Sequence, residues 1–149
     1  MLVLAIIGAG GVFTGTNPAY TTHELAHHLK TSKASFLISE PELLSNIVEA
    51  AKAFNIPENN ILIFNTVNQP IPNGFRSWES LLQHGEQDWV RFDDENKSKS
   101  TTAGRFFSSG TTGLPKAAVI SHYNFVAQHT LVYEMNEPKP WDVSFTIQI

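Results

Sequence analysis

The densest group of potentially reactive residues is the stretch from Ser108 to Lys116, which reads SSGTTGLPK. It combines four hydroxyl side chains, two glycines and one lysine. Glycine permits turns that point successive backbone N–H groups at one spot, hydroxyls add donors, and lysine adds a mobile positive charge. These properties are suited to holding a polyphosphate. The candidate phosphate-binding residues are Ser108, Ser109, Gly110, Thr111, Thr112, Gly113 and Lys116.

This phosphate loop (108–116) differs from the Walker A loop of nucleoside triphosphatases. When Gly110 is aligned with the first Walker glycine, Pro115 stands where a glycine belongs. Ala117 then stands where the pattern requires the Ser or Thr that binds Mg²⁺. A P-loop enzyme is therefore disfavoured. A plain Ser/Gly-rich hairpin is also disfavoured, because a hairpin needs only two or three turn residues.

A second motif is His23-Glu24-Leu25-Ala26-His27, a complete H-E-x-x-H on a predicted helix. Two histidines at i and i+4 face the same way and can bind Zn²⁺, with Glu24 as general base. The longer metzincin pattern fails, since Lys30 and Lys33 stand where a glycine and the third histidine belong. Glu49 is spaced suitably for a third ligand, although nothing around it repeats a known pattern.

An ordinary capped helix also accounts for the H-E-x-x-H segment. In that interpretation Thr21 or Thr22 caps the helix, Leu25 and Leu29 pack, and the histidines face solvent. We therefore assign no metal site and keep a zinc metalloprotease as the lesser alternative.

The composition excludes several classes of protein. Apolar residues make up 42% of the 149 residues, which is typical of a globular domain. The formal charge is -4, and the sequence has no Lys/Arg cluster. This argues against binding to nucleic acid or through a polybasic membrane patch. No cysteine is present, which excludes disulfides, thiolate metal sites and a Cys nucleophile. The apolar run Met1–Phe13 is too short to span a membrane, so we expect a buried element there in a cytoplasmic protein.

Strands and helices alternate along the predicted chain. The polar stretch 88–102 is expected to be a solvated surface loop. The alternation predicts an α/β fold with a mostly parallel sheet and flanking helices. Strands are predicted at 12–16, 34–39, 61–64, 105–107 and 117–120, and helices at 22–31, 41–54, 78–83 and 121–134.

Weaker signals lie at both ends of the chain. Gly8-Ala9-Gly10-Gly11 is an incomplete dinucleotide fingerprint, because its third glycine falls on Phe13. His122 is a candidate to reach a nucleotide bound by the loop, although a histidine at a helix start more often faces water. The aromatic residues expected in the core are Tyr123, Phe125 and Trp141.

The phosphate loop and its flanks resemble the signature of adenylate-forming enzymes. Phe106-Phe107 precedes the loop, and AVISHYN (118–124) follows it. The run GGVFTGTNPAYT (10–21) is similar to an earlier segment of the large N-terminal domain of acyl-CoA synthetases and 4-coumarate–CoA ligases. The resemblance covers nearly all of residues 3–135. One departure is Ala117, where the family usually has glycine.

The resemblance implies an activity and its ligands. A carboxylic acid attacks the α-phosphate of ATP to give an acyl-adenylate and pyrophosphate, and CoA then displaces AMP to give a thioester. The expected ligands are ATP with Mg²⁺, CoA and a small-molecule carboxylic acid. The loop would hold the β- and γ-phosphates.

Later motifs of the family do not occur in this sequence. These are a Tyr-Gly-x-Thr-Glu stretch, a Thr-Gly-Asp stretch, a hinge, and a C-terminal domain that carries a lysine. We therefore expect 1–149 to be a fragment of the AMP-binding N-terminal domain, with no assigned catalytic residue and no competence alone. The alternative is a non-catalytic protein that binds phosphate or a partner. Exposed sheet edges favour self-association, and a full-length member can also be peroxisomal.

Overall fold

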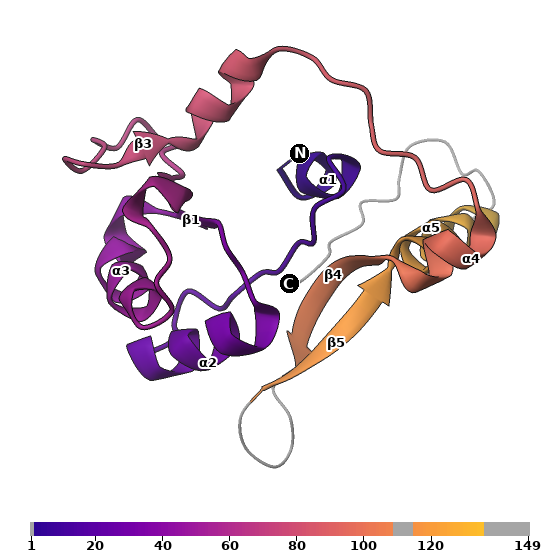
Figure 1. Cartoon of the computed structure of the whole chain (residues 1–149), viewed down its shortest axis with the longest axis horizontal. Coiled ribbons are helices and arrows are strands. Elements are labelled where there is room, and N and C mark those ends of the chain that lie inside the picture. The colour runs from indigo at the N-terminus through magenta and orange to yellow at the C-terminus, as the bar shows by residue number, and fades with distance from the viewer. Residues whose placement is uncertain (1, 109–114, 136–149) are drawn as a thin grey trace. The chain divides into compact units, whose positions relative to one another are not determined.

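The computed structural model describes residues 2–108 and 115–135, which form two compact units (Figure 1). The α2 unit takes its described residues from 16–88, 107–108 and 115–117. The α5 unit takes its described residues from 2–15, 89–106 and 118–135. Each unit is described separately below.

The α2 unit contains a parallel sheet of three short strands. In sheet order these are β1 (Leu37–Ser39), β2 (Ile61–Ile63) and β3 (Arg76–Ser77). The central strand, β2, is buried at every residue. This confirms the predicted parallel pairing of the strands at 34–39 and 61–64, whose apolar runs are typical of strands covered on both faces.

Helices cover this sheet and complete its core. The chain forms α2 (Thr22–Ser32), α3 (Leu44–Lys52) and three short 3-10 helices, η1 (Pro41–Leu43), η2 (Glu58–Asn60) and η3 (Trp78–His84). Helices α2 and α3 pack against each other. Two neighbouring apolar clusters form the core, with the buried members Leu25, Leu29, Leu44, Ala50, Ala51, Ile61 and Ile63.

Local signals at both ends of α2 explain its boundaries. The Thr21 hydroxyl accepts a hydrogen bond from the Glu24 N–H, and the Glu24 carboxylate accepts one from the Thr21 N–H. This capping box satisfies two backbone donors that the helix leaves unpaired. At the other end Lys33 adopts a left-handed conformation with φ of 55°, and its N–H bonds to the Leu29 carbonyl. The predicted helix at 22–31 is confirmed.

The α5 unit contains α1 (Leu2–Gly8), α4 (Glu95–Ser100) and α5 (His122–Met135). It also includes most of the paired strands β4 (Thr102–Ser108) and β5 (Lys116–Ser121), which run in opposite directions (Figure 1). The two ends that flank the phosphate loop belong to the α2 unit instead. The strands predicted at 105–107 and 117–120 and the helix at 121–134 are therefore confirmed.

The apolar N-terminal segment differs from its prediction. Residues 2–8 form a helix whose only buried residue is Gly8, and Leu4 is 60% exposed. The expectation of a buried element was therefore wrong. The strand predicted at 12–16 is reduced to a single bridge between Phe13 and Gly104. Among the described residues, no helix is long and apolar enough to cross a membrane.

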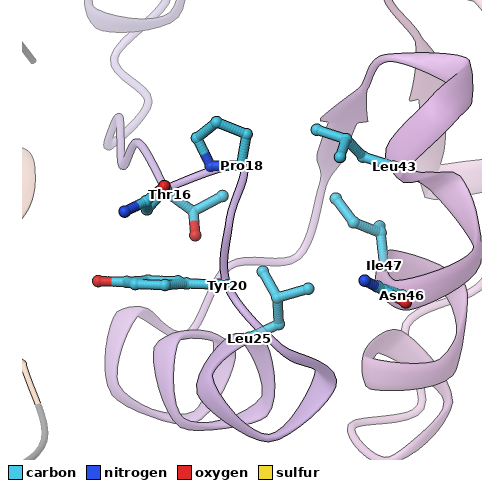
Figure 2. A pocket seen from close by; sticks show the side chains of 8 residues that line it. Thr16, Pro18, Tyr20, Leu25, Leu43, Asn46 and Ile47 are labelled. Atoms are coloured by element: carbon cyan, nitrogen blue, oxygen red, sulfur yellow. The ribbon is translucent and has the colours of Figure 1, made fainter.

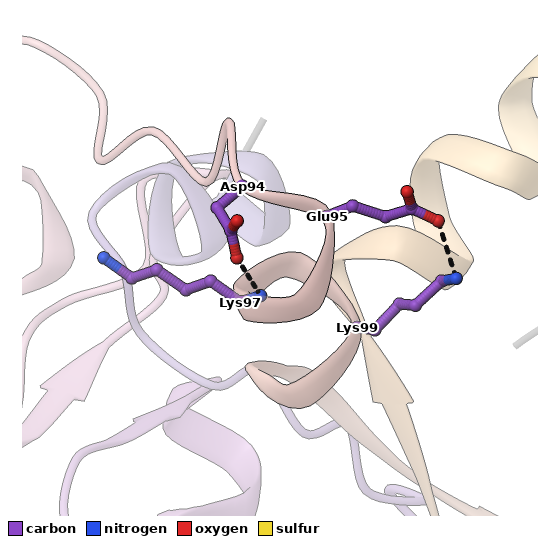
Figure 3. Close-up of polar contacts among 4 residues, drawn as sticks. All are labelled: Asp94, Glu95, Lys97 and Lys99. Carbon is purple, nitrogen blue, oxygen red and sulfur yellow. Dashed lines mark hydrogen bonds and ion pairs between the residues drawn. The ribbon is translucent and has the colours of Figure 1, made fainter.

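The polar stretch 88–102 is not entirely a loop, as we had expected. Its second half forms α4, because the Asp94 carboxylate caps the helix by accepting the Lys97 N–H at 2.7 Å (Figure 3). Glu95, the first residue of the helix, forms an i,i+4 ion pair with Lys99 at 2.6 Å. Ser98 is buried, so this helix also contributes to packing.

The predicted aromatic core is only partly present. Phe125 is half-buried against Phe106, with ring centroids 6.1 Å apart. Tyr123 is 39% exposed and lies beneath the Lys99 ammonium group instead, so its assignment to the core was wrong. Trp141 lies outside the described residues.

Candidate functional site

Two neighbouring strands present the described ends of the phosphate loop. Ser108 is the last residue of β4 and Lys116 is the first residue of β5, and both are exposed. A hydroxyl donor and a cation are therefore accessible at the two strand ends, which is the chemistry that a polyphosphate requires. The other candidate residues, Ser109, Gly110, Thr111, Thr112 and Gly113, lie outside the described residues.

The departure at Ala117 fits the backbone of β5. Outside glycine, positive φ angles among the described residues occur only at Lys33, Asn55 and Asn68. Ala117 therefore adopts an ordinary extended conformation in its strand, where a methyl group causes no strain.

The C-terminal end of the loop is bonded to α2. His27 Nε2 lies 3.1 Å from the carbonyl oxygen of Pro115, although 88 residues separate them in sequence. A carbonyl oxygen can only accept, so His27 Nε2 carries the proton and donates it. His27 is half-buried by this contact, and the prediction that it faces solvent was wrong.

The N-terminal end of the loop lies against His28 of α2, the residue that follows His27. The His28 ring stacks on the Phe107 ring of β4, with centroids 3.9 Å apart and planes at 28°. The Tyr20 ring also lies near His28, with the two ring centroids 6.4 Å apart. His28 is only 3% exposed, and this burial holds its pKa below the ordinary histidine value.

The H-E-x-x-H motif therefore has a structural use at two of its three positions. The Glu24 carboxylate belongs to the capping box, and this bonding to Thr21 lowers the Glu24 pKa. His27 bonds to Pro115, while His23 is exposed one turn earlier. Within residues 2–108 and 115–135, no group of three or more acidic or histidine side chains is placed to hold a metal ion.

The start of α5 is defined by its own cap. The Ser121 hydroxyl accepts from the Asn124 N–H at 3.2 Å, and the Asn124 side chain accepts from the Ser121 N–H at 3.0 Å. His122 follows, with its ring 4.0 Å from that of Phe92. His122 is half-buried rather than fully exposed to water as expected, and this burial lowers its pKa. Its buried Nε2 has no hydrogen-bond partner among the described residues.

A small cavity lies between the Asn17–Tyr20 turn, α2 and the helices at 41–52 (Figure 2). Its volume is about 20 Å³, which suits a single water molecule rather than a nucleotide or an acyl group. The lining residues are Thr16, Asn17, Pro18, Tyr20, Leu25, Leu43, Asn46 and Ile47.

Comparison with known proteins shows the family to which this chain belongs. The model of the AMP-binding enzyme family matches residues 1–146, so this chain belongs to that family. Acyl-CoA ligase azaF and phenylacetyl-CoA ligase epaB, both of Aspergillus niger, are each 49% identical over 146 residues. Each match covers 97% of this chain and 27% of the relative, so the chain spans about a quarter of their length.

A solved structure supports the fold alone. A natural red-emitting luciferase from Phrixothrix hirtus is similar with a TM-score of 0.73 at 23% sequence identity. The match covers 95% of this chain and 34% of the luciferase chain. Together with the family match, this likeness gives the protein the α/β fold of adenylate-forming enzymes, and its three-stranded sheet is parallel with flanking helices, as predicted.

Proposed function

We propose that this chain carries the ATP-phosphate-binding loop of an acid–CoA ligase. In the reaction, a carboxylate oxygen bonds to the α-phosphorus of ATP and pyrophosphate leaves, giving an acyl-adenylate. The sulfur of CoA then bonds to the acyl carbon, its thiol proton passes to solvent, and AMP leaves with the electron pair of the broken bond. Membership of the AMP-binding family and the acyl-CoA ligase relatives support this assignment.

In this proposal the loop binds the two terminal phosphates. Its hydroxyls and backbone N–H groups donate to phosphate oxygens, and Lys116 stabilises the charge that gathers on departing pyrophosphate. The loop sequence contains no carboxylate, so Mg²⁺ would reach it already bound to the phosphate oxygens. The observation that carries the proposal is the SSGTTGLPK sequence between adjacent strands whose ends expose Ser108 and Lys116.

Calorimetric titration of MgATP into the 149-residue chain tests the loop assignment. We expect Lys116→Ala to weaken binding about tenfold, the loss typical of one exposed charge-assisted hydrogen bond. Lys52→Ala is the matched control, because Lys52 is also exposed and lies in the same unit, but at the end of α3. Equal affinities for both variants and the parent chain would contradict the assignment, as would a parent chain that does not bind.

The acid substrate is tested separately from ATP binding. Phenylacetic acid is a reasonable first candidate, since epaB is a phenylacetyl-CoA ligase. We expect the 149 residues alone to release no AMP with ATP, CoA and this acid, because the sequence contains none of the family's later motifs. AMP release above background would overturn that expectation. Tripolyphosphate binding as tight as MgATP binding would favour the alternative, a non-catalytic phosphate-binding protein.

A further inference from the structure

We propose that His27 and His28 are positioning residues that hold the two described ends of the phosphate loop on α2. His27 holds the Pro115 end through a hydrogen bond, and His28 holds the Phe107 end through ring stacking. This inference rests on the proposed function, because it gives these histidines a role in ATP binding through the same loop. Neither side chain is assigned a contact with the nucleotide.

Adjacent positions on a helix are suited to this task. Consecutive side chains on an α-helix point about 100° apart, so one helix turn can contact two different strand ends. His27 contacts the chain just before β5, and His28 contacts β4 one residue before its end. The two contacts therefore lie on both sides of the loop, and each holds one of its two described ends.

The helix that carries these histidines is itself firmly held. Its first turn is fixed by the reciprocal Thr21–Glu24 capping box. Leu25 and Leu29, which flank the histidines, are both 7% exposed and pack with Ala50 of α3. A side chain on such a rigid element loses little further freedom when it bonds to a loop end. The contacts therefore fix the loop ends to the core of the α2 unit.

Two histidines of α2 provide a test position, His27, and a matched control position, His23. His23 lies one turn before His27 on the same helix, but it is exposed. His27→Ala removes the donor to Pro115, whereas His27→Gln keeps an N–H donor at a similar reach. His23→Ala removes an identical side chain without removing that bond. A general effect of changing α2 would therefore appear in the His23 variant as well.

Limited trypsin digestion tests the holding contact without any nucleotide. Trypsin cleaves the peptide bond after Lys116 only when the strand end opens locally. Mass spectrometry can follow this cleavage, with cleavage after Lys52 as an internal reference. We expect His27→Ala to raise the Lys116 cleavage rate about fivefold, the effect of one ordinary hydrogen bond. His27→Gln and His23→Ala should stay within about twofold of the parent chain. Equal Lys116 cleavage in all four proteins would overturn the inference.

MgATP calorimetry on the same proteins separates this inference from the proposed function. If the parent chain binds and His27→Ala binds about fivefold more weakly, with rescue by Gln, the positioning role is supported. If both bind equally, the positioning role is wrong while the proposed function stands. If the parent chain does not bind, the proposed function fails, and trypsin digestion still decides whether His27 holds the strand end.

His28 is tested by keeping or removing its aromatic ring. His28→Phe retains a ring that can stack on Phe107, whereas His28→Leu fills similar space without stacking. In the Leu variant we expect the Lys116 cleavage rate to rise about threefold and the MgATP affinity to fall about threefold. In the Phe variant both quantities should change by less than twofold. Circular dichroism checks that both variants remain folded. Identical results for the two folded variants would overturn the role of the stack.

Discussion

Replacing Ile63 by alanine should remove much of the stability of the α2 unit. Ile63 is 0% exposed on the central strand β2, and it packs with Leu44, Ala51 and Ile61. The substitution forfeits about 2.4 kcal/mol of transfer free energy, at about 0.8 kcal/mol per carbon group, and leaves a cavity. Strands pair with β2 on both sides, so its backbone cannot easily collapse into that cavity. We expect a loss of about 3–4 kcal/mol in the free energy of unfolding.

Urea unfolding followed by Trp78 fluorescence measures this loss. The Trp78 ring lies 5.4 Å from that of Phe64, next to Ile63, so its emission reports on this unit. The reference protein has Trp89 and Trp141 replaced by phenylalanine, which leaves a single fluorophore. Val67→Ala is the control, because Val67 is 73% exposed and its truncation should cost less than about 0.5 kcal/mol.

A loss below about 1 kcal/mol for Ile63→Ala, at an unchanged dependence on urea, would refute this account of the core. Such a result would mean that the strand moves inward and fills the cavity, so β2 is not held by its neighbours. An intermediate Ile63→Val variant should lose about 1 kcal/mol and verifies that the effect scales with the volume removed.

Two further predictions concern α2. Thr21→Ala removes the cap hydroxyl and should lower the free energy of unfolding in urea by about 1 kcal/mol, while Thr21→Ser should lower it much less. Equal losses in the two variants would show that the hydroxyl does not cap the helix. Because burial lowers the folded-state pKa of His28, the unfolded chain takes up a proton first as the pH falls below the ordinary value of 6.5. Unfolding free energy should therefore decrease on acidification from pH 7 to 5, by at most about 1.4 kcal/mol per pH unit. His28→Phe should show a smaller decrease, and an undiminished decrease would assign the effect to other groups, such as His122.

Several elements could be predicted because their signals are local. The α2 helix is marked by a capping box whose partners are three residues apart, and the apolar runs at 37–39 and 61–63 are typical of buried parallel strands. The two-residue strand β3 was missed, since Arg76 and Ser77 have no periodic pattern and form a strand only by pairing with β2. Helix α4 was missed because its polar composition resembles that of a solvated loop, although Asp94 was available as a cap. The expected self-association through sheet edges stays a prediction.

One part of the candidate site could likewise be predicted from local sequence, and another part could not. The amino-acid sequence alone predicts the chemistry proposed for the phosphate loop, because glycines, hydroxyls and a lysine within nine residues are sufficient to indicate it. Only the tertiary structure decided that His27 bonds to Pro115 and that His28 stacks on Phe107. These contacts join residues about eighty positions apart, and no local pattern encodes them. They arise because packing of α2 against the core brings two adjacent helical side chains to the ends of two strands.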